Sequence, residues 1–201
     1  MIPVQSRQSQ RITVFGLGKS GLTTARALLF GGADVSAWDD NPAARAEAAN
    51  EDIVLVDPVT LDWSGQDALV LSPGVPLTHP IAHPAAAAAR AAGKPVIGDI
   101  ELLFENIGDV KLIGITGTNG KSTTSALIHH VLDSTDTSVQ IGGNFGPPVL
   151  ALLPSPAADT LVLELSSYQL DLIDKAAFDI AVFLNLTPDH LDRHGNLDGY
   201  V

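Results

Sequence analysis

The hydrophobic pattern alternates between two kinds of segment along the chain. Short apolar runs rich in β-branched residues are followed by longer Ala- and Leu-rich segments, which is typical of a parallel sheet covered by helices. The first series predicts strands at 11–15, 35–38, 53–56, 68–71 and 95–97, and helices at 20–30, 42–50 and 80–92. The pattern therefore predicts an α/β fold that begins with a doubly wound parallel sheet.

A second series of the same kind follows. It predicts strands at 111–115, 138–141, 160–165 and 180–185, with helices at 121–132 and 167–176. We place the boundary near Gly98 and Asp99, so that residues 1–98 form one domain and residues 99–201 begin another. No strand or helix is expected after residue 196, and the second sheet is therefore expected to be incomplete.

Charge and composition exclude several classes of function. The 201 residues include 11 Lys and Arg against 23 Asp and Glu, a formal net charge of −12, which argues against non-specific binding to nucleic acid or to anionic membranes. The absence of cysteine excludes disulfides, thiolate metal sites and a cysteine nucleophile. No apolar run is long enough to span a membrane, and the first residues do not resemble a signal peptide. We expect a cytoplasmic protein.

The first chemical motif is a glycine-rich turn, Gly16-Leu-Gly18-Lys-Ser-Gly21, between an apolar strand and a helix. Such a turn can offer the free N–H groups of a helix N-terminus to a diphosphate. Asp39 and Asp40 end the next strand, where an acid can accept hydrogen bonds from a ribose or a base, and Ser72 ends the strand at 68–71. The alternative is a turn that only packs the helix on the strand.

The second motif is more specific, because a glycine-rich loop leads into a lysine and two hydroxyl residues. Its residues are Gly117, Thr118, Asn119, Gly120, Lys121, Ser122 and Thr123. In a phosphate-binding loop, N–H groups cradle the phosphates, the lysine contacts the β and γ oxygens, and a hydroxyl ligates Mg²⁺. The spacing is a variant, since Ile115 occupies the position of the usual first glycine. We expect an ATP site, with a purely structural turn as the alternative.

Glu164 lies in an otherwise apolar strand. A buried carboxylate without a partner is costly, so this position predicts a cation. Only four basic residues occur in 100–201, which favours Mg²⁺ over a buried lysine or a helix cap as the partner.

Two further loops follow predicted strands. In the segment 185–194, His190 could ligate a second metal ion, although a loop histidine is usually a solvent-exposed side chain. In the segment 142–146, the glycines would let Asn144 approach a ligand closely, although they too could be structural.

Taken in order, these motifs resemble the Mur ligases, and most of all their D-glutamate-adding branch. The resemblance rests on Thr116 through Ser122, Glu164 through Leu170 and Asn185 through Arg193, and it covers essentially the whole chain. It implies a Rossmann-like domain that binds a UDP-substrate, followed by a P-loop-type domain that binds ATP. The implied reaction begins when ATP phosphorylates the carboxylate of UDP-N-acetylmuramoyl-L-alanine. The amine of D-glutamate then attacks the acyl phosphate, in peptidoglycan synthesis.

The resemblance also implies roles for individual residues. Lys121, His190 and Asn144 correspond to catalytic positions, and Ser122, Glu164 and His190 to ligands of Mg²⁺. The implied substrate-binding residues are Gly18, Ser20, Gly21, Asp39, Asp40, Ser72, Asn144 and Ser166, and the implied ATP-binding residues are 117–123.

One departure from the family pattern is the end of the chain. Family members continue with a lysine that bridges the second metal and with a C-terminal domain that binds D-glutamate. We therefore expect a truncated, monomeric chain that cannot complete ligation alone. The alternatives are a stand-alone nucleotide-binding module, an NAD-dependent oxidoreductase and another ligase of the same family.

Overall fold

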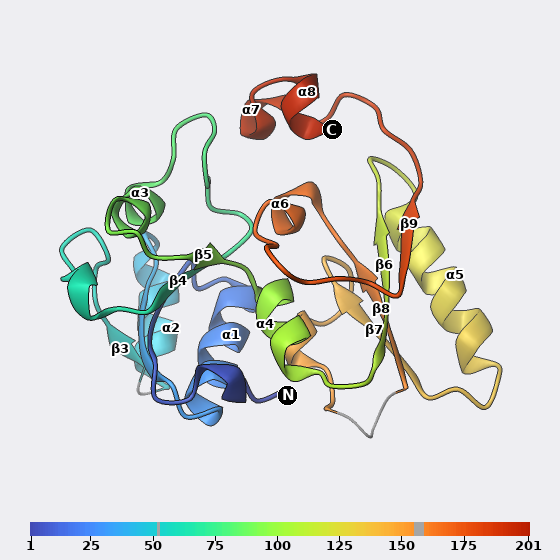
Figure 1. The fold of residues 1–201 in the computed structure, drawn as a ribbon, viewed down its shortest axis with the longest axis horizontal. Helices are drawn as coiled ribbons and strands as arrows, with labels where there is room; N and C mark the ends of the chain where they lie inside the picture. Colours follow the sequence, from blue (N-terminus) through green and yellow to red (C-terminus); the bar gives the residue numbers. More distant parts are fainter. Residues whose placement is uncertain (52, 155–158) are drawn as a thin grey trace.

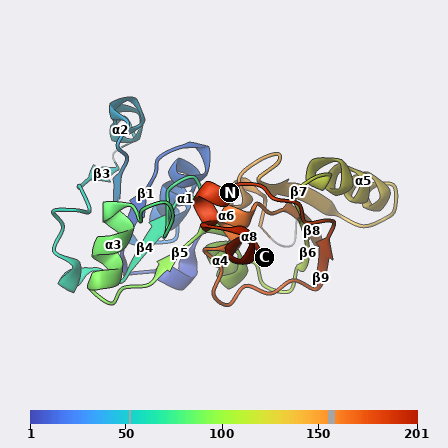
Figure 2. The same cartoon turned by 90° about the horizontal axis from the view of Figure 1, so that it is seen from above.

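The structure is a computed structural model that describes residues 1–51, 53–154 and 159–201. Two all-parallel sheets lie side by side along the long axis of the molecule (Figure 1). Seen from above, helices α4 and α6 lie between the two sheets (Figure 2). This arrangement confirms the predicted α/β class with doubly wound parallel sheets.

The first sheet has the order β3-β2-β1-β4-β5. Its strands are β1 (Arg11–Phe15), β2 (Asp34–Trp38), β3 (Val54–Leu55), β4 (Ala68–Leu71) and β5 (Val96–Ile97). Helices α1 (Lys19–Phe30) and α2 (Pro42–Ala49) pack against one face, while α3 (Pro84–Ala91) and the short η2 (Trp63–Gly65) pack against the other. Side chains alternate between the faces, because successive residues of a strand point in opposite directions.

The second sheet has the order β7-β8-β6-β9. Its strands are β6 (Lys111–Thr116), β7 (Val139–Gly143), β8 (Thr160–Glu164) and β9 (Ile180–Phe183). Helix α5 (Lys121–Asp133) covers the outer face, at the right of Figure 1. After β6 the chain forms β7 and β8 on one side of β6 and then β9 on its other side. The strand order therefore reverses at β6, at its carboxyl end. Ligands of such sheets bind at this edge.

One hydrophobic core continues through both sheets. Buried Val14 of β1 and Leu163 of β8 belong to the same cluster, joined through α4 (Asp99–Asn106) and η3 (Val149–Ala151). The N-terminal segment, with η1 (Gln5–Arg7), crosses the same junction, and Ile2 N–H donates to Leu150 O at 2.9 Å. Near Gly98 the chain therefore passes from the first sheet to the second, while the hydrophobic core continues without a break.

The predicted helix at 167–176 is wrong in its length, since α6 (Ser167–Leu170) ends after four residues. The last three residues of the predicted helix are held instead by a side chain of α4. Glu101, which is buried, accepts backbone N–H groups from Asp174, Lys175 and Ala176 at 3.0 to 3.1 Å. In a continuing helix, these N–H groups would donate to backbone carbonyls one turn earlier. Here they donate to the carboxylate of Glu101 instead.

Other boundaries also differ from the sequence predictions. Helix α3 begins at Pro84 because the ring of His83 accepts the N–H of Ala85 at 3.2 Å and caps it. Helix α4 was not predicted, and neither were the short helices α7 (Leu191–His194) and α8 (Leu197–Tyr200). Within the described residues, no helix is long and apolar enough to cross a membrane.

We predict that Glu101→Gln destabilises the chain by about 2 to 3 kcal/mol, because the buried side chain loses its charge and one of the two oxygens that accept the N–H groups of residues 174–176. Urea unfolding followed by circular dichroism measures the change. Glu47→Gln is the control, since Glu47 is exposed on α2 and should change stability by less than about 0.5 kcal/mol. Equal effects of the two substitutions would contradict the assigned role of Glu101.

Candidate functional site

A cleft of about 320 Å³ opens at the carboxyl edge of the second sheet. It lies between the loop after β6, the start of α6 and the C-terminal helices. Five residues expected at the site line this cleft together, namely Gly117, Lys121, Asn144, Ser166 and His190. They come from the four loops that follow β6, β7, β8 and β9. The carboxyl ends of these parallel strands share one edge of the sheet, so the loops meet there.

The loop between β6 and α5 is shaped by two glycines with positive φ. Gly120, at +86°, begins helix α5, and Gly117, at +137°, lies against the backbone of Asn185. A Cβ at Gly117 would lie 3.1 Å from the backbone N and O of Asn185. Lys121 folds back over this loop, and its Nζ donates to Gly117 O at 2.7 Å and to Thr118 O at 3.0 Å.

The N–H groups of this loop serve two different purposes. Those of Thr118 and Asn119 donate to Asn185, at 3.1 Å and 3.0 Å, so they brace the loop against the segment after β9. The N–H groups of residues 120–123 have no acceptor within the described parts of the chain. These four groups, at the positive end of the α5 dipole, are the donors available to an anion. Ser122 and Thr123 are exposed there.

Glu164 ends β8 beneath the cleft and is 2% exposed. Its Oε1 accepts from Asn144 Nδ2 at 2.8 Å, whereas its Oε2 is buried and has no hydrogen-bond partner among the described residues. Gly143 makes this approach possible, because a Cβ there would lie 2.3 Å from Glu164 O. A buried carboxylate oxygen without a partner fits a hard cation, since Mg²⁺ prefers carboxylate oxygens and completes its shell with phosphates and water.

His190 has a left-handed backbone, with φ of +51°, which is unusual for a residue other than glycine. Its side chain is about half exposed. Its N–H donates to Asp189 Oδ1 at 2.9 Å, and its ring centroid lies 4.9 Å from that of Tyr168. Among the residues described, no three His, Asp or Glu side chains gather closely enough to hold a metal ion by themselves.

Ser166 already has a structural role at the N-cap of α6. It forms a capping box with Gln169, in which each side chain meets the backbone of the other residue. The cleft therefore has a rigid border at this position, set by reciprocal hydrogen bonds.

The side chain of Asp39 stabilises the first glycine turn through hydrogen bonds. This carboxylate accepts Leu17 N–H at 2.6 Å and Asn41 N–H at 2.7 Å, so it shapes the turn directly. Ser72 Oγ donates to Gly16 O at 2.6 Å, and Asp40 pairs with His83 at 3.0 Å. Three of the expected substrate-binding residues therefore already have protein partners.

The glycines of this turn have different surroundings. A Cβ at Gly18 would meet nothing within 4 Å, while one at Gly21 would lie 1.7 Å from Gly16 O. Gly21 thus lets α1 pack on the turn, and Gly18 leaves an open surface at the start of the helix. Ser20 points the other way, toward the second domain, and donates to Asp99 Oδ2 at 2.5 Å.

Asp99 is buried in the junction between the two domains. Burial raises the pKa of its carboxyl group above the ordinary aspartate value, and hydrogen bonding from Ser20 and Gln169 opposes this shift only in part. Its Oδ1 has no hydrogen-bond partner in the described structure.

Sequence reasoning missed several residues around the cleft. The sequence indicates no individual role for Tyr168 and Arg193, although both lie in segments that carry the family resemblance, nor for Tyr200, and Asp99 marks only the expected boundary. His194 is 7% exposed and its Nε2 lies 2.9 Å from Ser167 Oγ, although a histidine in a loop is usually solvent-exposed. The one available signal was the density of aromatic and charged side chains in the last segment.

Models of two Mur ligase domains match this chain. The MurD-like N-terminal domain of Mur ligases matches residues 10–98, and the Mur ligase middle domain matches residues 115–201. The chain belongs to the Mur ligase family.

Curated relatives agree with this assignment. The UDP-N-acetylmuramoylalanine–D-glutamate ligase of Caulobacter vibrioides is 51% identical over 207 residues, and that of Agrobacterium fabrum is 52% identical over 205. Each alignment covers 100% of this chain and 44% of the relative, so the chain spans less than half the length of these relatives. The crystal structure of the UDP-N-acetylmuramate:L-alanyl-gamma-D-glutamyl-meso-diaminopimelate ligase from Neisseria meningitides matches with a TM-score of 0.55. It is 24% identical and covers 95% of this chain and 65% of that one, which supports the fold.

We predict that Gly21→Ala destabilises this Mur ligase chain by about 3 kcal/mol or more, because its Cβ would overlap the carbonyl of Gly16. Gly18→Ala is the matched control on the same turn and should cost about 1 kcal/mol or less. Urea unfolding of both variants gives the comparison. Similar losses in both would show that the turn does not pack as described.

A second prediction concerns Asp99. Because its folded pKa is raised, the folded state binds its proton more tightly than the unfolded state does, and stability is lost as pH rises from about 4 toward the folded pKa. Asp99→Asn removes this loss. We expect the melting temperature of the variant, relative to that of the unsubstituted chain, to rise between pH 4 and pH 7. A difference that stays constant with pH would contradict the shift.

Proposed function

We propose that this chain forms the UDP-substrate-binding and ATP-binding half of a UDP-N-acetylmuramoylalanine–D-glutamate ligase. One observation carries the proposal. A lysine on a glycine-rich loop, four free N–H groups and a buried carboxylate oxygen without a partner meet at one edge of the second sheet. This combination suits a magnesium-bound triphosphate, and few other ligands need all three features.

In the proposed ATP site, the N–H groups of residues 120–123 hold phosphate oxygens. Lys121 leaves the carbonyls of Gly117 and Thr118 and pairs with the β and γ phosphates, where its charge finds a stronger partner. Glu164, Ser122 and His190 are the candidate ligands for Mg²⁺, which when bound supplies the positive charge that offsets developing charge in phosphoryl transfer. Asn144 orients Glu164 through the bond to Oε1.

The first domain is proposed to bind the uridine diphosphate part of UDP-N-acetylmuramoyl-L-alanine. Gly18, at the open start of α1, offers the approach to the helix N-terminus, with Ser20 and Ser72 beside the turn. Asp39 and Asp40 lie at the carboxyl end of β2, where the nucleoside would bind. The muramoyl-alanine part would then extend toward Asn144 and Ser166 in the cleft.

The complete reaction is an amide synthesis. The substrate carboxylate attacks the γ-phosphorus of ATP and releases ADP, and the amine of D-glutamate then attacks the acyl carbon and releases phosphate. We propose that D-glutamate binds in the part of such ligases that lies outside the 44% matched by this chain. We propose a cytoplasmic role in peptidoglycan synthesis, with the chain acting as a monomer.

We predict that Lys121→Ala weakens binding of ATP–Mg²⁺ at least tenfold, because the loop loses its only side-chain cation. Isothermal titration calorimetry of this chain measures it, with UDP-N-acetylmuramoyl-L-alanine as a second ligand whose affinity should stay within twofold. Lys175→Ala is the control, because Lys175 is exposed and outside the cleft.

Two results would oppose the proposal. Unchanged affinity for ATP–Mg²⁺ in Lys121→Ala would remove this lysine from the site. Tight binding of NAD without any response to the UDP-substrate would overturn the assignment of the first domain.

A further inference from the structure

Arg193 joins the segment that carries His190 to the first domain. It lies in α7, three residues after His190, and its guanidinium reaches a loop more than a hundred positions earlier in the sequence. Nη1 donates to Gly74 O at 2.9 Å, and Nη2 donates to Pro73 O at 3.3 Å and to Val75 O at 3.0 Å. Three carbonyls of one turn therefore converge on one side chain.

The same guanidinium packs on the floor of the cleft. Its central carbon lies 4.3 Å from the centroid of the Tyr168 ring, which is the geometry of a cation–π contact. The Tyr168 ring in turn contacts His190, with centroids 4.9 Å apart, and both residues line the cleft. The Tyr168 ring is thus the one side chain that separates Arg193 from His190 in this series of contacts.

On its other side, the anchored loop leads to the first glycine turn. Val75 N–H donates to Ser72 O at 2.9 Å and closes a tight turn, and Ser72 Oγ donates to Gly16 O at 2.6 Å. A continuous series of contacts therefore runs from the proposed diphosphate-binding turn, through Ser72 and Arg193, to Tyr168 and His190. It connects the two ends of the proposed substrate path.

The chemistry of arginine suits this position better than that of lysine. A guanidinium presents five N–H donors in a planar fork, so it can meet several carbonyls and stack on an aromatic ring at once. A lysine ammonium would keep the charge without the fixed geometry. No carboxylate of the described structure forms an ion pair with Arg193. Its N–H donors therefore remain available to the three carbonyls of residues 73–75.

We propose that Arg193 is a positioning residue that sets where His190 lies relative to the first glycine turn. The inference rests on the function proposed above, because it takes the substrate to span from that turn to the cleft. The other attachments of segment 189–200 lie at His194 and Tyr200. His194 contacts Ser167 Oγ at 2.9 Å and Asp171 Oδ2 at 3.6 Å and stacks on Tyr168, and Tyr200 contacts Thr118 at 3.0 Å. Loss of Arg193 would free the His190 end of this segment from the first domain.

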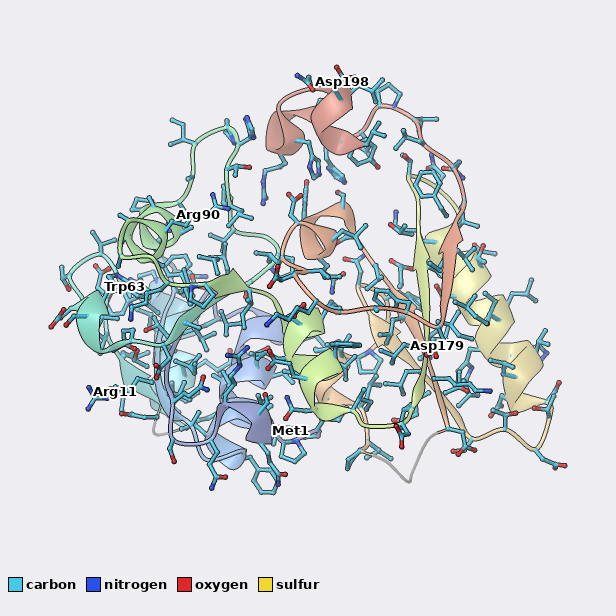
Figure 3. All side chains as sticks on the ribbon, in the orientation of Figure 1. Met1, Arg11, Trp63, Arg90, Asp179 and Asp198 are labelled. Atoms are coloured by element: carbon cyan, nitrogen blue, oxygen red, sulfur yellow. The ribbon has the colours of Figure 1, made fainter. Side chains whose placement is uncertain are left out.

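The first experiment needs no ligand. Since the chain has no cysteine, Ala87→Cys on α3 and Asp198→Cys on α8 introduce two unique spin-label sites, and Asp198 lies on the outer side of α8 (Figure 3). Pulsed electron resonance then gives the distribution of distances between the labels. We expect Arg193→Ala and Arg193→Lys both to broaden it at least twofold. A distribution as narrow as that of the unsubstituted chain would overturn the inference.

Arg90→Ala is the matched control for both experiments. Arg90 is exposed on α3, and its Nη1 makes a single hydrogen bond, to Leu77 O at 3.3 Å. It should leave the distribution of distances unchanged and the ligase activity within twofold. If it broadens the distances as much as Arg193→Ala does, the effect is not specific to Arg193 and the inference fails.

The second experiment measures steady-state ligation in the complete natural protein. Arg193→Ala and Arg193→Lys should lower kcat at least tenfold while the KM for ATP stays within threefold, because the ATP loop is untouched. A role in stability alone would lower the melting temperature and leave kcat unchanged, which would overturn the inference. If the unsubstituted protein shows no D-glutamate-dependent ligation, the proposed function fails. The spin-label distances then still decide whether Arg193 fixes α7 and α8 against the first domain.

Discussion

The structure depends on two buried carboxylates in the first turn of α4. Asp99 and Glu101 lie where the chain passes from one sheet to the other, and neither has a cation as partner in the described structure. The hydroxyl of Ser20 donates to Asp99, and the N–H groups of residues 174–176 donate to Glu101, so these donors come from two other segments. Because an unsatisfied buried carboxylate is so costly, these donors must stay in place, and they fix α1 and the segment after α6 against α4. The two sheet edges at which we propose ligand binding are thereby oriented by a single helical turn.

The acidic balance of the chain is compatible with two proposed phosphate sites. Backbone N–H groups at the starts of α1 and α5 provide positive potential without adding net charge, and Lys121 is the one cation in the lysine loop. Acidic side chains are then free for other tasks, such as the packing of Glu164 beneath the cleft. A charge of −12 is therefore no obstacle to the two proposed sites, where helix dipoles and the local lysines, Lys19 on the first turn and Lys121 on the second, would meet the phosphates.

Much of the fold was predictable from the sequence, because its strands are short apolar runs with clear limits. The strands at 11–15 and 68–71 have the predicted bounds, and the glycine loops lie where parallel sheets bind ligands. Two of the failures share one physical cause, which is competition from distant residues. The predicted helix at 167–176 does not continue through its last three residues, because Glu101, some seventy positions away, takes their N–H groups. Likewise, nothing near Arg193 in the sequence indicates the carbonyls of residues 73–75.

The continuous core also limits how these two domains can move. A hinge at Gly98 would have to expose buried side chains such as Leu103 and Leu150, at about 25 cal/mol for each Å² of apolar surface. Rotation of one sheet against the other is therefore opposed by the same packing that folds them. Helices α7 and α8 lie outside this continuous core, and side chains such as Arg193 and His194 attach them to it. The position of His190 relative to the two sheets therefore depends on these few side-chain contacts and not on a hinge between the domains.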